Sequence, residues 1–240
     1  MRYLVEIEYD GSNFYGFQRL NGKRTVQEEL EKALTIINKK NVLIKGAGRT
    51  DKNVHAYGQR AHFDLDINIP VDNLRVALND IVPKDIYIKD IKEVDNNFHA
   101  RFDVKKKIYQ YKINVGKYDP LKSNYYLQLD YDIDIKKLIK CSRLFLGIHN
   151  FKNFVSGQRN NYEAIIYDIK VKKSKDIITI TFEGKSFYRY MVRNMVGAML
   201  DVATSKANIS KIKEMLDNFD KKQELSCAKP EGLYLMKIYY

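Results

Sequence analysis

The sequence of 240 residues has no tryptophan and only two cysteines, Cys141 and Cys227, which lie far apart. Without a CxxC pair, these cysteines indicate neither a zinc site nor a disulfide framework, and they fit a reducing compartment. The histidines, at positions 55, 62, 99 and 149, also lack metal-ligand spacing. We therefore expect no bound metal.

Long apolar runs are missing as well. The first ten residues carry charges where a signal peptide needs an apolar core. The most apolar helical segment, 191–203, contains Arg193 and Asp201, so it cannot span a bilayer. We expect a soluble, cytoplasmic protein with no membrane partner.

Positive charge is in excess, with 42 Lys and Arg against 30 Asp and Glu, a net charge of +12 and a pI near 9.4. Such an excess indicates a polyanionic partner, and nucleic acid is the commonest one. A membrane surface is the competing partner, but no helix shows a polar face made only of Lys and Arg. The 18 Tyr and 11 Phe residues must partly form the core, yet aromatics interleaved with basic residues also suit unpaired bases.

The first hundred residues show the periodicities of an α+β fold. Period-two alternation predicts strands over 3–9, 42–47, 57–66 and 85–94. A capping box from Thr25 to Glu28 predicts a helix behind it, and Pro70 opens a second helix. The resulting β-α-β-β-α-β order is that of a ferredoxin-like unit.

The second half predicts a similar mixture of strands and helices. The expected elements are a strand over 108–115, a helix capped by Asp134, a hairpin of 164–172 and 177–183, helices over 187–203 and 209–219, and a strand over 232–240. We place the boundary near residue 104. Residues 1–103 then form an N-terminal half that carries Asp51, and residues 104–240 form a C-terminal half.

The candidate chemistry lies in residues 48–56, between two expected strands. This stretch holds a glycine, an arginine, a carboxylate and a histidine. On its own it suits a solvated turn, with Gly48 for the bend and Asp51 capping its own backbone. A P-loop is excluded because no glycine precedes Lys52 and because Asn53 stands where Ser or Thr is required. A GxSxG motif is absent, and no second acid marks a glycosidase.

Arg193 falls on the apolar stripe of its helix, beside Val192 and Val196, so we expect it to be half-buried. A buried arginine requires a carboxylate partner. Asp51 is one candidate and Asp201, two turns further on, is another. From the residues alone, an ordinary structural ion pair is the default interpretation.

Six stretches in order carry a resemblance: Gly48-Arg49-Thr50-Asp51 with Val54-His55-Ala56; Phe98-His99-Ala100-Arg101; Lys107-Ile108-Tyr109-Gln110-Tyr111; Gly147-Ile148-His149-Asn150-Phe151 with Phe154; Met191-Val192-Arg193-Asn194-Met195-Val196-Gly197; and Gly232-Leu233-Tyr234-Leu235. Together they resemble the tRNA pseudouridine synthase A family over nearly the whole chain. The chain departs from that family at Asn53, where glycine is usual, and at Asn150, where aspartate is common. It also departs in Ala228-Lys229-Pro230, where Ala and Pro are usually adjacent.

The resemblance implies an isomerase that converts uridine to pseudouridine at positions 38–40 of the tRNA anticodon stem-loop, without metal, cofactor or nucleotide. It implies an α+β pseudouridine synthase fold, in which two ferredoxin-like (RRM-like) halves share an extended, mostly antiparallel sheet around a central active-site cleft. It also implies a homodimer.

The resemblance further assigns roles to five residues. Asp51 becomes the catalytic carboxylate, either as a nucleophile at C1′ or as a base that gives a glycal intermediate. Arg193 would keep Asp51 ionised. Tyr109 would stack on the target base, Arg49 would fill the gap left by the flipped nucleotide, and Leu233 would line the base pocket.

Two other functions remain open from the residues. A non-catalytic basic RNA-binding protein could use the same scaffold, although it has no need for an arginine-paired carboxylate beside phosphates. A phosphotransferase would require a nucleotide and magnesium.

Overall fold

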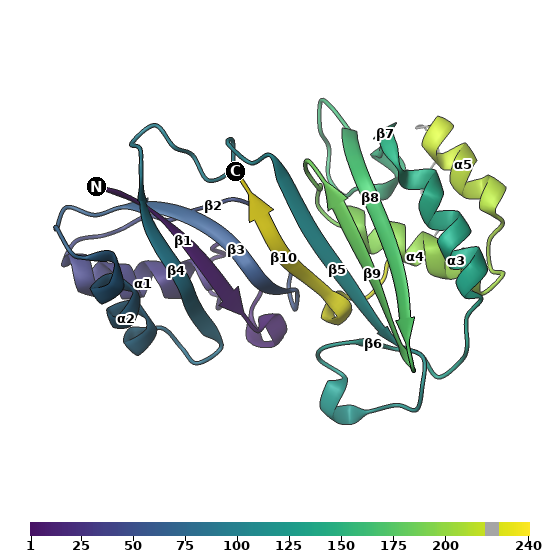
Figure 1. Cartoon of the computed structure of the whole chain (residues 1–240), viewed down its shortest axis with the longest axis horizontal. Coiled ribbons are helices and arrows are strands. Elements are labelled where there is room, and N and C mark those ends of the chain that lie inside the picture. Colours follow the sequence, from purple (N-terminus) through teal and green to yellow (C-terminus); the bar gives the residue numbers. More distant parts are fainter. Residues whose placement is uncertain (219–225) are drawn as a thin grey trace. The chain divides into compact units, whose positions relative to one another are not determined.

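The computed structural model of the chain describes residues 1–218 and 226–240 (Figure 1). Its internal contacts form two compact units. Unit 1 comprises residues 1–105 and 234–240, and unit 2 comprises residues 106–233. The last strand, β10 (Leu233–Tyr239), therefore belongs to unit 1 except for its first residue.

Unit 1 confirms the predicted β-α-β-β-α-β order. Its elements are β1 (Arg2–Tyr9), the short 3-10 turn η1 (Gly11–Asn13), α1 (Val26–Asn38), β2 (Lys45–Gly46), β3 (His55–Asp64), α2 (Val71–Ile81) and β4 (Ile86–Val94). Strand β1 pairs antiparallel with both β3 and β4, and β2 pairs antiparallel with β3. This is the arrangement of an antiparallel ferredoxin-like sheet.

The outer edge of β3 is shared by two strands. Its second half pairs with β2, and its first two residues, His55 and Ala56, pair with β10 in parallel. The backbones of the two strands approach closely, since a Cβ on Gly58 would lie 2.5 Å from the carbonyl oxygen of Met236. Strand β10 thus supports the start of β3, directly after the stretch that carries Asp51.

Strand β2 is much shorter than the predicted 42–47. The backbone N–H of Val42 donates to Thr35 Oγ1 at 3.3 Å, and that of Ile44 donates to Glu31 Oε1 at 3.0 Å. Side chains of α1 therefore take donors that a strand partner would otherwise use. Val42 and Ile44 are buried, as their apolar pattern predicts. The strand predicted at these two residues is wrong, because β2 begins only at Lys45.

The predicted capping box of α1 is wrong in its hydrogen bonds. Thr25 does occupy the N-cap position, but its side chain makes no capping bond. Its Oγ1 is buried and finds no hydrogen-bond partner among residues 1–218 and 226–240. The helix is held instead by its buried apolar face, in which Leu30 and Leu34 are fully enclosed.

Unit 2 contains eight regular elements and four short 3-10 turns among its described residues. They are β5 (Lys106–Asn114), η2 (Pro120–Lys122), β6 (Leu127–Gln128), α3 (Ile135–Ser142), η3 (Arg143–Phe145), β7 (Gly147–Asn150), η4 (Lys152–Phe154), β8 (Glu163–Ser174), β9 (Ile177–Gly184), α4 (Met191–Ala203), α5 (Ile209–Asp217) and η5 (Pro230–Gly232). The neighbouring strands β5, β9, β8 and β7 pair antiparallel in that order, and β6 runs parallel to β5. The predicted β8–β9 hairpin is confirmed.

The helices of unit 2 partly match their predicted bounds. Asp134 caps α3 as expected, because its Oδ1 accepts from the N–H of Lys137 at 3.0 Å. Helix α4 begins at Met191 rather than 187, since Tyr190 has a left-handed φ of 62° that no helical residue adopts. Helix α5 ends at Asp217, and Phe219, which was assigned to it, lies outside the described residues.

The fold class is α+β with mostly antiparallel strands, as predicted. Each unit has its own core. Tyr3, Ile7 and Phe63 are fully enclosed in unit 1, and Tyr111 and Phe182 in unit 2. In residues 1–218 and 226–240, none of the helices is both long and apolar enough to cross a membrane.

Candidate active site

The loop that carries Asp51 is anchored on both sides of the aspartate. On one side, Thr50 is buried and its Oγ1 lies 2.8 Å from the hydroxyl of Tyr9. The amide of Gln59 donates to the carbonyl oxygen of Gly48 at 3.1 Å. On the other side, the N–H of Val54 donates to the carbonyl oxygen of Asp51 at 3.2 Å and closes a turn. Asp51 itself is half-buried, so a carboxylate stands on a fixed backbone at a partly desolvated position.

A second loop packs directly against this one. The N–H of Phe17 donates to the carbonyl oxygen of Thr50, and the N–H of Asn53 donates to that of Phe14, both at 3.2 Å. The approach depends on Gly16, which has a φ of 96° and whose Cβ would lie 2.5 Å from the Thr50 carbonyl oxygen. A side chain at Gly16 would therefore displace the backbone next to Asp51.

The turn after Asp51 requires one left-handed residue, and that residue is Asn53, with a φ of 62°. Asparagine tolerates this region better than most residues, so Asn53 can fill the place where the family usually has glycine. Gly48 is not among the glycines with positive φ. The bend attributed to Gly48 in the simple-turn interpretation is thus made by Asn53.

Cationic side chains surround the loop. Arg49 is exposed, and its guanidinium donates to Gln18 Oε1 at 2.8 Å. The ammonium of Lys52 lies 4.5 Å from the ring centroid of Tyr15, and that of Lys23 lies 4.9 Å from the same ring. These groups offer positive charge to a polyanion beside the single carboxylate.

His55 is buried at the start of β3 and has a structural setting. Its Nδ1 accepts from the N–H of Gly11 at 3.0 Å, and its ring stacks on Tyr234 with 4.7 Å between centroids. Asp10 Oδ1 lies 3.2 Å from the same Nδ1. The buried bond from Gly11 corresponds to the tautomer with the proton on Nε2.

In unit 2, Arg193 lies half-buried in the first turn of α4 and its side chain is oriented by two contacts. Its Nε donates to the carbonyl oxygen of Ala228 at 2.7 Å, and its Cζ lies 4.7 Å from the ring centroid of Tyr190. Because Nε bonds to Ala228, a carboxylate would have to bind the guanidinium through its two terminal nitrogens. The expected half-burial of Arg193 is confirmed.

The segment around Ala228 is held along one face of α4. The carboxylate of Asp201 accepts from the N–H and the hydroxyl of Ser226, at 2.8 and 2.9 Å. Between these two anchor points stands Gly197, whose Cβ would lie 1.6 Å from the Ser226 carbonyl oxygen. Positions 193, 197 and 201 are one helical turn apart and share a face. Asp201, the alternative partner for Arg193, therefore binds Ser226.

Tyr109 and Leu233 are the other predicted site residues of unit 2. Tyr109 lies on β5, is 7% exposed and meets Phe187 edge to face with 5.1 Å between ring centroids. Leu233 is 5% exposed and follows η5. A Cβ on Gly232 would lie 2.6 Å from the carbonyl oxygen of Lys112, so η5 packs tightly on β5. Both side chains are compatible with core packing as well as with a base pocket.

Tyr111, two residues after Tyr109, is fully buried and remains a neutral donor. Its hydroxyl donates to the carbonyl oxygen of Lys229 at 2.6 Å. Burial, and next the nearby Glu231, raise the pKa of Tyr111 well above its usual value. The bond adds a further attachment for the segment that orients Arg193.

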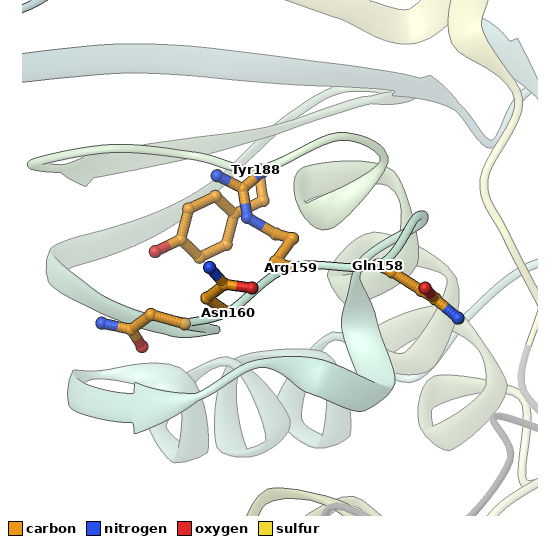
Figure 2. A pocket seen from close by; sticks show the side chains of 5 residues that line it. Gln158, Arg159, Asn160 and Tyr188 are labelled. Carbon is orange, nitrogen blue, oxygen red and sulfur yellow. The ribbon is translucent and has the colours of Figure 1, made fainter.

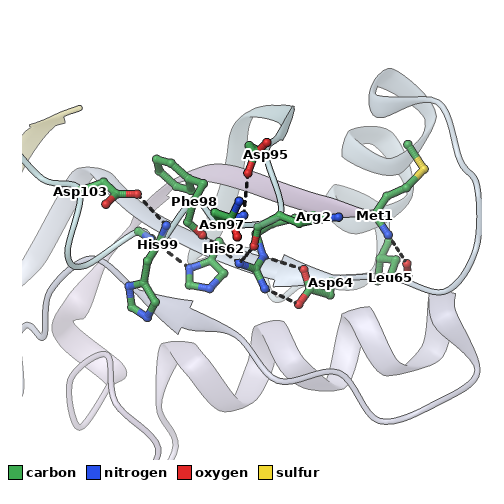
Figure 3. Close-up of polar contacts among 12 residues, drawn as sticks. Met1, Arg2, His62, Asp64, Leu65, Asp95, Asn97, Phe98, His99 and Asp103 are labelled. Atoms are coloured by element: carbon green, nitrogen blue, oxygen red, sulfur yellow. Dashed lines mark hydrogen bonds and ion pairs between the residues drawn. The ribbon is translucent and has the colours of Figure 1, made fainter.

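The Phe98-His99-Ala100-Arg101 stretch is fixed to unit 1 by a polar network, drawn in Figure 3. The N–H of Ala100 donates to His62 Nδ1 at 3.1 Å, and the N–H of His99 donates to Asp103 Oδ2 at 2.8 Å. Arg2 forms a two-pronged ion pair with Asp64 and also donates to the carbonyl oxygen of Phe98 at 3.0 Å. This network holds the stretch against the sheet of unit 1.

Sequence reasoning located Arg49 and Asp51 on one loop of unit 1, and Tyr109, Arg193 and Leu233 in unit 2. That all five serve one cleft stays a prediction. The sequence did not reveal the residues that support these side chains. They are Tyr9 and Gly16 for the Asp51 loop, and Tyr190, Gly197 and the Asp201–Ser226 pair for Arg193. The only local signal was Gly197, a glycine inside an apolar helix, which usually has a packing reason.

No group of three or more His, Cys, Asp or Glu side chains within residues 1–218 and 226–240 is placed to hold a metal ion.

Comparison with known proteins identifies the family of the chain. A family model described as tRNA pseudouridine synthase matches residues 6–103 and 141–240. Asp51 falls in the first matched segment, Arg193 and Leu233 fall in the second, and Tyr109 lies between them.

Three proteins named tRNA pseudouridine synthase A illustrate the similarity. Those of Thermosipho melanesiensis and Finegoldia magna are each 40% identical, over 246 and 240 residues, and that of a Geobacillus species is 38% identical over 243 residues. The matches cover 100%, 98% and 100% of this chain and 99%, 98% and 98% of those proteins. The chain belongs to the tRNA pseudouridine synthase family, as the resemblance predicted. It is an isomerase that converts uridine to pseudouridine, and the non-catalytic alternative is not favoured.

Proposed function

We propose that this chain converts uridines at positions 38–40 of the tRNA anticodon stem-loop to pseudouridine, with Asp51 as the catalytic carboxylate. The observation that carries the proposal is the anchoring of the Asp51 loop. Thr50 is bonded to Tyr9, the Asp51 carbonyl closes a turn with Val54, and a second loop packs on the backbone beside it. Such support holds a reacting group within the small tolerance that catalysis requires.

The reaction balances without an added reactant. The C1′–N1 bond of uridine breaks, the uracil turns, a bond forms between C1′ and C5, and the C5 proton leaves for solvent while N1 gains one. Ionised Asp51 acts either by attacking C1′ and forming a covalent intermediate, or by taking the C2′ proton to give a glycal. Both routes require a carboxylate and no metal.

The other site residues support this carboxylate. In the proposal, the terminal nitrogens of Arg193 approach Asp51 and keep it ionised, since an opposite charge favours the charged form. Tyr109 stacks on the flipped base and Leu233 lines its pocket. Arg49, exposed two residues before Asp51, fills the gap in the tRNA and offsets part of the cost of flipping, which is a few kcal/mol.

In the proposal, the protein recognises its tRNA substrate by shape rather than by base sequence. A net charge of +12 supplies many phosphate contacts, which position an RNA with little base reading. The proposal also includes a cytoplasmic homodimer, by resemblance to the family. Light scattering of the purified chain at micromolar concentration tests the dimer, and a mass of one chain would contradict it.

The decisive experiment uses tRNA labelled with tritium at uridine C5, because formation of the new C–C bond releases that tritium. We expect release by the wild type. Asp51→Asn should lower it by at least about 10⁴-fold with tRNA binding retained, since the amide keeps the shape but not the charge. Transcripts with cytidine at position 38, 39 or 40 then assign the target. Binding without release by the wild type would contradict the proposal, and release from uridines outside the anticodon arm would contradict its site.

A further inference from the structure

Away from the residues assigned above, unit 2 has an open polar pocket of about 480 Å³, lined by Gln158, Arg159, Asn160, Asn161 and Tyr188 (Figure 2). Four lining residues come from the loop between η4 and β8, and Tyr188 comes from the segment before α4. None of the five carries negative charge, so the lining suits an anionic or neutral polar ligand.

The central feature of the pocket is a stacked pair. The guanidinium carbon of Arg159 lies 4.0 Å from the ring centroid of Tyr188. Arg159 is exposed, while Tyr188 is half-buried. The guanidinium therefore lies over the Tyr188 ring, on a side chain that is exposed to solvent. Unpaired bases stack on arginine planes of this kind.

The pocket walls are fixed by hydrogen bonds. The N–H of Arg159 donates to the hydroxyl of Tyr162 at 3.0 Å, and the hydroxyl of Tyr188 donates to the carbonyl oxygen of Glu163. The N–H of Glu163 donates to Asn161 Oδ1 at 2.7 Å. The chain enters the loop through Gly157, whose φ of 91° favours glycine. These bonds hold the loop backbone around Arg159 and the ring of Tyr188 in place.

The remaining polar groups match the edges of a base. Gln158 and Asn160 each carry two N–H donors and one carbonyl acceptor on a neutral amide. Bases present both donors and acceptors, so amides can serve an unpaired base whichever edge it shows. Lys185 and Arg189, exposed on the same segment as Tyr188, add positive charge for the adjoining phosphates.

We propose that this pocket binds one unpaired nucleotide of the tRNA substrate, with its base stacked on the Arg159 guanidinium and its edge bonded by Gln158 or Asn160. The inference rests on the proposed function, because it takes tRNA as the ligand. It adds a contact that none of the predicted site residues provides. The nucleotide bound here is held by stacking and is not the one that reacts.

The test measures equilibrium binding of unmodified tRNA to the Asp51→Asn protein, in which chemistry is blocked, with and without changes in the pocket. Arg159→Ala and Arg159→Lys should each weaken binding by about tenfold, the scale of one lost base stack. Lysine keeps the charge but lacks the plane, so Arg159→Lys should retain nearly the same dependence on salt concentration as the parent. Arg143→Ala, at an exposed arginine of η3, is the matched control and should change binding by less than about threefold.

Tyr188→Phe separates stacking from folding, because it keeps the ring and removes only the hydroxyl bonded to Glu163. Because the ring under Arg159 is kept and only its attachment is lost, Tyr188→Phe should weaken tRNA binding less than Arg159→Ala does. Wild-type binding by Arg159→Lys, or an equal loss in Arg143→Ala, would overturn the nucleotide site and leave only general charge attraction. Uridine and adenosine monophosphates, added at millimolar concentration, should not displace the tRNA, and displacement at micromolar concentration would identify a free-nucleotide site instead.

The two proposals can fail separately. If the wild type releases no tritium, the proposed reaction is wrong. The pocket is then still tested by the equilibrium binding of tRNA to the Arg159 variants. In an active enzyme, Arg159→Ala should raise KM for tRNA by about tenfold with kcat unchanged, because the stack holds ground and transition states alike. A fall in kcat at unchanged KM would contradict a role in substrate holding.

Discussion

Arg193 and Ala228 bind each other twice, once through a side chain and once through the backbone. The Nε of Arg193 donates to the Ala228 carbonyl oxygen at 2.7 Å, and the N–H of Ala228 donates to the Arg193 carbonyl oxygen at 3.1 Å. This reciprocal pair sets the direction of the guanidinium before any substrate arrives. Electrostatic groups that are oriented in advance avoid reorganisation during the reaction, which is where much of enzymatic rate enhancement originates.

Arg193→Lys is the first prediction. Lysine has no Nε to donate to Ala228 and no planar fork for a carboxylate, so it keeps only the charge. We expect kcat in the tritium assay to fall by about 100-fold, with KM for tRNA changed by less than about threefold. Arg143→Lys, which makes the same change at an exposed position, should leave both constants unchanged. Wild-type kcat in Arg193→Lys would show that charge alone suffices there.

Gly197→Ala is the second prediction. Alanine in a helix interior normally stabilises relative to glycine by about 0.5–1 kcal/mol. Here the added Cβ would lie 1.6 Å from the Ser226 carbonyl oxygen, so the segment bonded to Arg193 and Asp201 has to move. We expect the opposite sign, a loss of about 1–3 kcal/mol in the free energy of unfolding by urea. kcat should fall with it, because the Ala228 contact of Arg193 is displaced. A stabilised Gly197→Ala protein with full activity would contradict this arrangement.

The third prediction concerns Asn53, the left-handed residue after Asp51. A non-glycine residue in this region costs about 1–2 kcal/mol, and the Oδ1 of Asn53 is buried without a hydrogen-bond partner among the described residues. Asn53→Gly should therefore unfold at the same or higher urea concentration than the wild type. Asn53→Ala should lose about 1 kcal/mol of unfolding free energy.

Ser205, with a φ of 60°, provides a matched control for this pair of changes. Ser205→Gly should be more stable than Ser205→Ala, as expected for the Asn53 pair, but neither change should alter kcat. Asn53→Ala should also lower kcat, because Asn53 lies in the same turn as Asp51. Equal stability of the two Asn53 variants would mean that the turn does not need a left-handed residue.

The order of strands and helices was predictable because it depends on short-range periodicity. The alternation of Tyr3 to Tyr9 gave β1, and the Asp134 cap gave the start of α3. The errors came from backbone groups with partners that periodicity does not reveal. Glu31 of α1 takes the N–H of Ile44 and shortens β2, and the left-handed Tyr190 delays α4 by four residues.

The candidate site divides in the same way. The placement of Asp51 in a loop between two strands was predictable because its motif is local. The groups that hold Asp51 were not, since Tyr9 and Gly16 lie more than thirty residues earlier and meet the loop only through the fold. The Arg159–Tyr188 stack was missed because neither residue stands in a recognisable pattern, and its loop showed only weak periodicity.

The fourth prediction is a pH dependence centred on His62. The ring is 4% exposed, and its Nδ1 accepts from the N–H of Ala100. Burial lowers the pKa of His62 to about 4, helped by His99, Arg2 and Lys45, while Asp64 acts in the opposite direction. The ordinary pKa of histidine is about 6.5. Between these two values the unfolded chain takes up a proton that the folded protein does not.

The free energy of unfolding should therefore be complete above pH 6.5 and fall as the pH drops towards 4, by up to about 1.4 kcal/mol per pH unit from this residue. Urea unfolding of the wild type and His62→Gln at pH 7 and pH 5 isolates the contribution. Glutamine does not titrate but can still accept from Ala100, so the stability advantage of the wild type should shrink at pH 5. An NMR titration of the His62 ring gives the pKa directly, and a midpoint near 6.5 would contradict the burial argument.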